Sequence, residues 1–252
     1  MRLFEFGDQP WFPKILRDGE TAYLAIAYKA LPLARAWVDR MLAVLQPRGC
    51  VTILDLCSGA GGPLEQMVDE FRARDYQVSV TMSDLYPSGR STPHPAIHWR
   101  PEPVDARNVP AELHGIRTMF SAFHHFEPQS AQAILEDAFR RRLSICIFEA
   151  GPDNLLGIAS MLLVPLNVLV LMPFARPFRW EYLIFTYLIP LLPLMIFWDG
   201  VVSMLRIYTP EQMRKMVEDL KVPDYVWEIG ALRVHRIPGA LPYLIGRPVI
   251  AA

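Results

Sequence analysis

Four polar segments in the first half of the chain carry residue types that could bind a ligand or move a proton. Asp55–Gly62 has the sequence DLCSGAGG, Asp84 and Asp105 supply carboxylates, and Ser121–Phe126 (SAFHHF) contains two adjacent histidines. Carboxylates accept hydrogen bonds from hydroxyl and amino groups. Imidazole titrates near neutrality and can take a proton from a nucleophile. The residue types therefore favour a ligand site with a candidate general base.

The glycine-rich segment has two interpretations on its residues alone. Gly59 and Gly61 let the backbone turn sharply and approach a ligand closely, but a tight strand-to-helix turn needs the same freedom without any ligand. A dinucleotide fingerprint, GxGxxG, would need a third glycine at the position of Leu64. Asp55, ahead of the glycines, would also repel a pyrophosphate. These two observations argue against a nicotinamide cofactor and leave a plain turn open.

The other polar segments also have purely structural alternatives. Asp84 could cap a helix or close a turn, and Asp105 lies in a loop, where aspartate is common. Either histidine could cap the following helix or hydrogen-bond the backbone. Whether these residues form a ligand site therefore depends on where the predicted strands and helices place them.

Short apolar runs alternate with helical patterns through most of the chain. Runs bounded by turn residues predict strands, and apolar residues three and four positions apart, as between Leu64 and Phe71, predict helices. Thr209 and Gln212 are spaced as a capping box and predict a helix over 209–220. The predicted strands cover 51–56, 76–84, 96–100, 115–123, 143–151, 225–234 and 241–250.

This order of elements predicts an α/β fold. We expect a Rossmann-like, doubly wound, seven-stranded sheet that is mostly parallel and ends in a C-terminal antiparallel hairpin. Ligands bind such sheets outside the carboxyl ends of the strands. The four polar segments follow the first four predicted strands, so we expect them to meet at one edge of the sheet.

In this order the four segments resemble the class I S-adenosylmethionine-dependent methyltransferases. The resemblance covers about residues 48–150 and the terminal helix and hairpin, and it implies methyl transfer with S-adenosyl-L-methionine as cofactor. One departure is Cys57, which stands where the family's first loop glycine usually stands. By this likeness the methionine part is lined by Asp55, Cys57, Ser58, Gly59 and Gly61, the ribose is held by Asp84, the adenine by Leu85, Asp105 and Ala106, and the sulfonium lies beside Ser121 and Phe123.

The candidate catalytic residues follow the fourth and fifth predicted strands. His124 is the first choice of general base and His125 the second. Glu149, at the end of the fifth strand, is expected to face the same cleft. No residue spacing indicates a metal site.

An apolar insertion separates the fifth strand from the last helix. Residues 155–174 and 182–198 contain no charge, and 175–181 between them carry Arg176 and Arg179. The two runs have the lengths of membrane spans. Three alternatives remain open: a transmembrane hairpin, which would translocate both arginines against the positive-inside tendency; a dip into one leaflet; and a soluble helical lid.

The leaflet and lid alternatives both predict an apolar acceptor, such as a lipid, polyketide or terpenoid. Trp11 in the opening loop and Trp198, Asp199 and Arg206 at the end of the insertion, after its apolar runs, are candidate substrate contacts. The last three could equally form the end of a helix with an ordinary ion pair.

Composition limits the remaining possibilities. The formal net charge is −1, which makes nucleic acid a poor partner. The three cysteines show neither metal spacing nor a disulfide pattern, and no signal peptide is apparent, so we expect a cytoplasmic protein, peripheral or monotopic at a membrane. We expect an N-terminal helical lid (1–46), a core (47–152 and 207–252) and the insertion (153–206). The alternatives to a methyltransferase are a nicotinamide-dependent oxidoreductase and a non-catalytic membrane-associated module.

Overall fold

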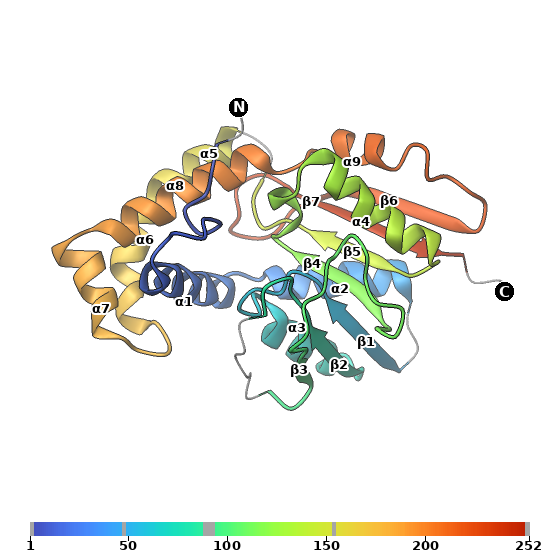
Figure 1. Ribbon diagram of the computed structural model, residues 1–252, viewed down its shortest axis with the longest axis horizontal. Coiled ribbons are helices and arrows are strands. Elements are labelled where there is room, and N and C mark those ends of the chain that lie inside the picture. Colours follow the sequence, from blue (N-terminus) through green and yellow to red (C-terminus); the bar gives the residue numbers. More distant parts are fainter. Residues whose placement is uncertain (1–2, 47–48, 88–93, 153–154, 250–252) are drawn as a thin grey trace.

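A seven-stranded sheet forms the centre of the molecule (Figure 1). The computed structural model describes residues 3–46, 49–87, 94–152 and 155–249. The strand order is β3-β2-β1-β4-β5-β7-β6; β7 runs antiparallel to β5 and β6, and the other neighbours are parallel. This confirms the predicted sheet and its terminal hairpin. The strands are β1 (Cys50–Asp55), β2 (Gln77–Met82), β3 (Ile97–Trp99), β4 (Ile116–Phe120), β5 (Ile145–Phe148), β6 (Tyr225–Leu232) and β7 (Leu241–Pro248).

The register of the parallel strands brings their carboxyl ends together. Asp55, the last residue of β1, pairs with Met82 at the end of β2 and with Thr118 in β4. All four residues of β5 are buried, as expected for a strand covered on both faces. The polar residues that follow β1, β2, β4 and β5 therefore lie at one edge of the sheet.

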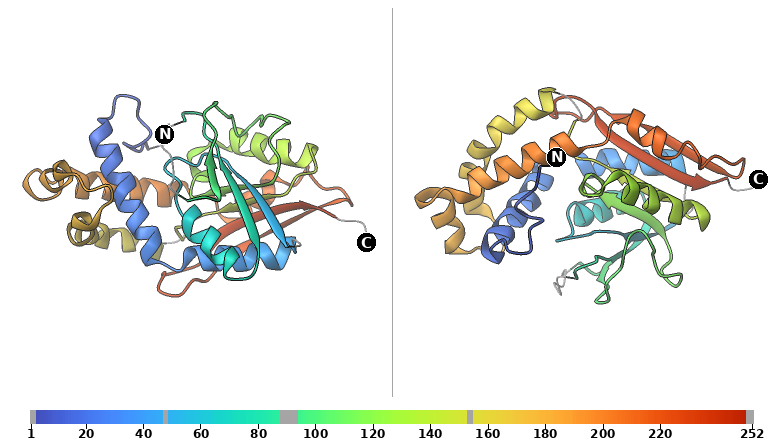
Figure 2. Two further views of the ribbon diagram at one scale, coloured as in Figure 1. Left: turned by 90° about the horizontal axis from the view of Figure 1, so that it is seen from below. Right: turned by 45° about the horizontal axis from the view of Figure 1, so that its top comes forward.

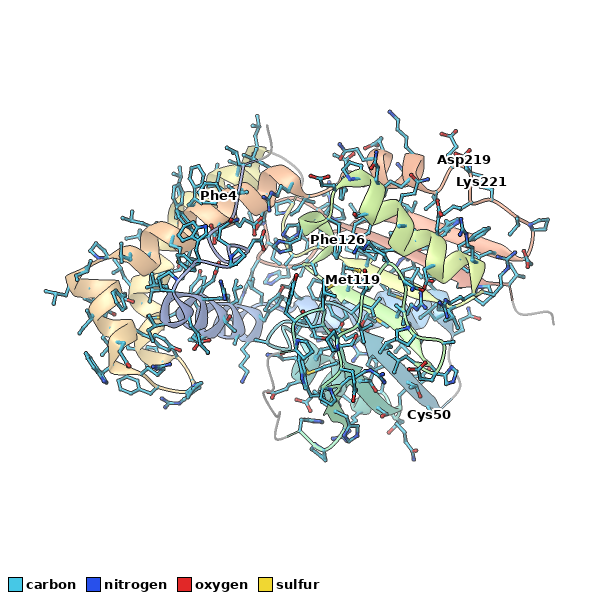
Figure 3. The ribbon with its side chains drawn as sticks, viewed as in Figure 1. Phe4, Cys50, Met119, Phe126, Asp219 and Lys221 are labelled. Carbon is cyan, nitrogen blue, oxygen red and sulfur yellow. The ribbon has the colours of Figure 1, made fainter. Side chains whose placement is uncertain are left out.

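Two apolar layers hold helices against the sheet. One face is covered by α2 (Leu33–Leu45) and α3 (Leu64–Arg72), and Trp37 there stacks on Phe148 of β5. The other face is covered by α4 (Pro128–Arg140) and α9 (Pro210–Met216), with fully buried Met119 of β4 in this layer (Figure 3). The capping box of Thr209 and Gln212 is present at the start of α9, as predicted.

A second, helical part lies beside the sheet in all the views of Figures 1 and 2. Its core contains Phe12 and Leu16 from the N-terminal region, Val168 and Met172 from the insertion, and Leu192. The first helix, α1, therefore packs on the insertion, whereas α2 packs on the sheet. The helices of this part are α1 (Lys14–Ala30), α5 (Leu155–Ser160), η2 (Met161–Leu163), α6 (Val164–Leu171), η3 (Met172–Phe174), α7 (Trp180–Leu183), η4 (Ile184–Leu188, a π-helix) and α8 (Leu191–Arg206).

The second apolar run is divided into two helical arms at Pro190. Its helix ends at Leu188, and α8 begins at Leu191 after Pro190, with a bend of 81° between the two arms. Proline lacks an N–H and cannot continue the helical ladder, which explains the break. α8 then continues past Trp198 to the charged Arg206.

Candidate functional site

Asp55 forms the floor of the glycine-rich loop. Its Oδ1 accepts a hydrogen bond of 2.6 Å from the Thr118 hydroxyl, and its backbone oxygen accepts bonds from the hydroxyls of Ser58 and Ser83. Asp55 is only 3% exposed, and this burial raises the pKa of its carboxyl group to about 7. These bonds join the ends of β1, β2 and β4 below the loop.

The loop itself has a conformation that favours glycine. Gly59, Gly61 and Gly62 have φ of 53°, 97° and 44°, and Cys57 also has a positive φ of 56°. Beyond the neighbouring residues, a Cβ at Gly59 would meet no heavy atom of the described chain within 4 Å, so the space above the loop is open there. Burial raises the pKa of the Cys57 thiol, which keeps it in the neutral form.

Asp84 lies directly beside the loop. Its Oδ2 accepts a hydrogen bond of 3.0 Å from the Gly59 amide, and its Oδ1 accepts one of 2.9 Å from the Tyr86 amide. A carboxylate offers about four acceptor positions, so each oxygen keeps capacity for one ligand hydroxyl. Neighbouring Leu85 is 41% exposed and available to a flat apolar ligand group.

Asp105 and Ala106 follow β3 and close this part of the site. The Asp105 carboxylate accepts hydrogen bonds from the Arg107 side chain, the shortest 2.7 Å, and this partner lowers the pKa of Asp105. Ala106 is buried. An adenine amino group would have to share Asp105 with Arg107.

Ser121 occupies the end of β4 in a left-handed conformation, with φ of 49°. Its hydroxyl accepts a hydrogen bond of 3.1 Å from the Ala150 amide, and it also bonds the hydroxyl of Tyr28 from α1. Burial raises the pKa of Tyr28 to about 12. Tyr28 also approaches the loop, since a Cβ on Gly62 would lie 4.0 Å from its ring.

His124 forms a buried pair with Glu149. Its Nδ1 lies 2.7 Å from Oε2 of Glu149, and its backbone amide donates to Oε1 at 3.1 Å. Both residues are buried, at 3% and 0% exposure. These two bonds to the Glu149 carboxylate hold the ring and the backbone of His124 in place. An ionised Glu149 favours a proton on Nδ1 of His124 and leaves a lone pair on Nε2. Phe123, just before, is fully buried and packs edge-on against Tyr208.

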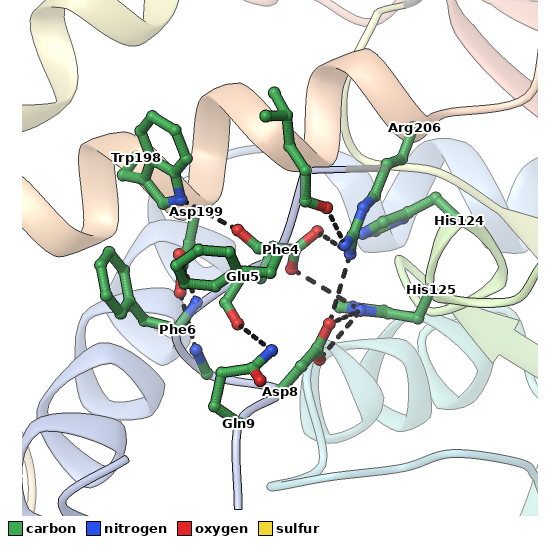
Figure 4. Close-up of polar contacts among 12 residues, drawn as sticks. Phe4, Glu5, Phe6, Asp8, Gln9, His124, His125, Trp198, Asp199 and Arg206 are labelled. Carbon is green, nitrogen blue, oxygen red and sulfur yellow. Dashed lines mark hydrogen bonds and ion pairs between the residues drawn. The ribbon is translucent and has the colours of Figure 1, made fainter. Parts of the chain in front are cut away.

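The His125 ring lies next to that of His124, with ring centroids 4.3 Å apart, and faces the N-terminal segment (Figure 4). Its Nδ1 lies 3.2 Å from Asp8 and 3.6 Å from Glu5. Burial alone would lower the pKa of His125, but the hydrogen bond to Asp8 and the charges of Glu5 and Asp8 outweigh it and raise the pKa to about 8.

Hydrogen bonds and ion pairs hold residues 3–8 against the C-terminal half of α8 (Figure 4). The Arg206 guanidinium donates to Glu5 at 2.8 Å, to Asp8 and to the backbone oxygen of Leu3. Asp199 accepts the amides of Phe6 and Gly7 at 2.7 and 2.9 Å, and Trp198 donates its indole N–H to the Phe4 oxygen. The predicted substrate candidates Trp198, Asp199 and Arg206 thus bind the chain's own N-terminal segment.

This segment is rich in carboxylates. Glu20 of α1 lies near Glu5, Asp8 and Asp199, and burial together with these neighbours raises its pKa to about 8. Burial also raises the pKa of Asp199 to about 6. Trp11, the remaining substrate candidate, is 66% exposed and contacts Phe6 and Phe12.

One group of side chains has the residue types of a metal site. Glu5, His124 and His125 each place a ligand atom within 4.8 Å of the others. Arg206 already pairs with Glu5, so a metal ion would compete with a fixed cation. The absence of a metal cofactor stays a prediction.

Several residues of this site were missed by sequence reasoning. Glu5, Asp8, Glu20 and Tyr28 come from the N-terminal region, and their partners lie about 100 to 200 positions away or on another helix. No spacing pattern marks contacts of that kind. Among the predicted residues, Asp55, Asp84, His124 and Glu149 lie at the carboxyl edge of the sheet; their roles toward ligands stay predictions.

Comparison with known proteins supports the fold. No family model matches the chain, and no curated protein matches it by sequence. The plantazolicin methyltransferase BpumL, solved with a monoazolic desmethylPZN analog and SAH, is similar with a TM-score of 0.52 and 11% identity, over 92% of this chain and 85% of that one. A Methanococcus maripaludis protein (mmp1179), described as a candidate S-adenosyl-L-methionine-dependent methyltransferase, has a TM-score of 0.52 and 11% identity over 94% of both chains. The chain has the Rossmann-like fold of the class I methyltransferases.

Proposed function

We propose that this chain transfers a methyl group from S-adenosyl-L-methionine to an apolar small molecule or lipid-like acceptor. The observation that carries the proposal is the pairing of Asp84 with the Gly59 amide at the edge of a sheet with this strand order. It joins a carboxylate with spare acceptor positions to a glycine loop with open space above it. Both solved relatives named above are methyltransferases by their descriptions, which supports the same reaction type.

The cofactor would be held along the carboxyl ends of β1, β2 and β4. Asp84 would accept the ribose hydroxyls, and the loop from Cys57 to Gly61 would admit the methionine part above Asp55. Leu85 and Asp105 would contact the adenine. When bound, S-adenosylmethionine supplies a methyl group activated by a sulfonium. The chain's own contribution is alignment of the acceptor in a site closed by α1 and residues 3–8.

His124 is the group best placed to take a proton from the acceptor. Glu149 holds Nδ1 at 2.7 Å, so the proton would be received at Nε2. The same carboxylate stabilises the imidazolium that results, as a carboxylate does in other His-based catalytic sites. His125 is the weaker candidate because its charge already balances Glu5 and Asp8.

Calorimetric titration with S-adenosylhomocysteine and, separately, with NAD tests the proposal. We expect S-adenosylhomocysteine to bind and NAD not to bind. Binding of NAD alone would support the oxidoreductase instead. Failure of both ligands to bind a folded protein would favour a non-catalytic module.

A further inference from the structure

The helices of the insertion expose apolar side chains in regular stripes. Leu162, Leu166, Val170 and Phe174 follow one another at intervals of four residues and are 59–68% exposed. The interval of four places them on one side of the helical segment 157–174. Only 17% of that segment is buried, although its length and composition would suit a membrane span. A helix side that faces water ordinarily carries polar residues.

α8 carries exposed as well as buried apolar side chains, on two adjacent sides. Its buried side includes Leu192, Met195 and Val202, which pack in the protein. Its exposed side carries Leu191, Leu194 and Leu205, at 42%, 62% and 56% exposure. The buried side accounts for the packing of α8, so the second apolar side needs another partner.

The bend before α8 adds to the same surface. Tyr187, Leu188 and Ile189 are 52%, 76% and 50% exposed at the junction of the two arms. We call the exposed apolar side chains of helices α5 to α8 and this junction the apolar face. At its margin, Arg176 and Phe178 between η3 and α7 are exposed, as is Trp180 at the start of α7.

We propose that the apolar face inserts into one leaflet of a lipid bilayer. Residues 155–174 and 182–198 carry no charge, as hydrocarbon contact requires. Exposed arginine, tryptophan and phenylalanine at the margin match the headgroup region. The two arms of the bent helix lie at 81°, so they present side chains in different directions. Fluid lipid can cover such a surface, whereas a flat protein partner cannot.

The geometry favours one leaflet over a span. A span needs about 20 residues of continuous helix. The bent pair offers arms of Trp180–Leu188 and Leu191–Arg206, each shorter than that. The segment 157–174 is held to the protein by Val168 and Met172, which are buried against α1 and α8.

The surface also indicates where the acceptor comes from, and this step rests on the proposed function. α8 begins at exposed Leu191 in the apolar face and ends at Arg206, whose guanidinium binds Glu5 next to His125. Sixteen helical residues cover about 24 Å. The helix thus runs from the lipid-facing surface to the side of the site where His125 lies against His124, the candidate base. We infer that the acceptor is a molecule dissolved in the membrane.

Flotation with phosphatidylcholine vesicles, without cofactor, tests the surface. We expect the full chain to float with the vesicles and Leu166→Glu/Val170→Glu to lower the bound fraction by at least about tenfold, because two apolar side chains are replaced by charges. Val226→Glu, a single change of an apolar residue to glutamate at a 42% exposed position on β6, outside the apolar face, is expected to float as the unaltered chain does. Circular dichroism checks that all three remain folded.

Two outcomes would overturn the proposal. One is an unaltered chain that stays monomeric in detergent-free buffer and does not float. The other is a stable dimer that Leu166→Glu/Val170→Glu dissociates, which would make a second copy the partner of the apolar face. Calorimetric binding of S-adenosylhomocysteine by the same preparations separates these results from a failure of the proposed function.

Discussion

Two carboxylates of the site, Asp84 and Glu149, differ in the groups from which they accept hydrogen bonds. Asp84 binds two backbone amides and keeps positions open toward the loop, whereas Glu149 is fully buried and holds one imidazole. The first arrangement suits binding of a ligand. The second suits orientation of a base.

Asp84→Ala is expected to weaken the binding of S-adenosylhomocysteine by about 1–3 kcal/mol, the usual cost of removing a partner from buried polar groups. Calorimetric titration of the variant measures this directly. Asp105→Ala serves as a comparison, because Arg107 already occupies its carboxylate and a smaller loss is expected. Unchanged affinity in Asp84→Ala would remove this residue from the ribose role.

His124→Ala is expected to lower turnover more than it lowers cofactor affinity, because a base acts in the transition state. Glu149→Gln should act in the same direction through the orientation of the imidazole. The readouts are kcat with an apolar acceptor and the Kd of S-adenosylhomocysteine. Equal turnover in His124→Ala would mean that alignment alone suffices for this transfer.

At the scale of elements, the N-terminal segment joins α8 to the histidines through charges. His125 has a pKa of about 8, above its ordinary 6.5, so its stabilising charge is complete below pH 6.5 and is lost as the pH rises through 8. Glu20, raised from 4.5 to about 8, also loses stability as the pH rises, because it must ionise in a buried site. Both groups therefore act in the same direction.

We expect the free energy of unfolding to fall between pH 6 and pH 9, with about 1 kcal/mol of the fall due to His125 after allowance for its partial exposure. Urea denaturation at the two pH values measures it. His125→Gln should reduce the fall and Glu20→Gln should reduce it separately. A fall of the same size in both variants would contradict this account of the network.

The sequence predicted the sheet well because its signals are local. Leu64, Met67, Val68 and Phe71 mark α3 by their spacing, and Asp55 and Asp84 follow apolar strands whose carboxyl ends must share an edge. For His124 and Glu149, the sequence predicted only that both would face the same cleft, and not that they would form a hydrogen bond. The contacts of Glu5 and Asp8 could not be predicted, since they depend on how the insertion folds back onto the core.

At the scale of the whole molecule, insertion by the apolar face would determine how the protein is oriented on a bilayer. The helices that carry it form the helical part beside the sheet (Figure 1). Arg176 of its margin precedes α7 and Trp180 begins that helix. A protein inserted by this face keeps both its margin and its sheet on one side of the bilayer.

A cysteine at Pro177, in a chain with Cys50→Ser, tests this orientation in sealed vesicles. We expect an impermeant maleimide to label it from the side that carries the catalytic part. Labelling only from the opposite side would establish a transmembrane hairpin. A cysteine at exposed Lys215 of α9 controls for the side on which the core lies.

The contacts between residues 3–8 and α8 also depend on the order in which the chain is synthesised. Glu5 is made 201 positions before Arg206, and Phe6 is made 193 positions before Asp199. The ribosome therefore completes the glycine loop and the histidines while Glu5 and Asp8 still lack their arginine. A chain interrupted before α8 would leave Glu5 and Asp8, the two carboxylates beside His125, without Arg206. The surroundings of the candidate base are therefore complete only after residues 155–206 have been made.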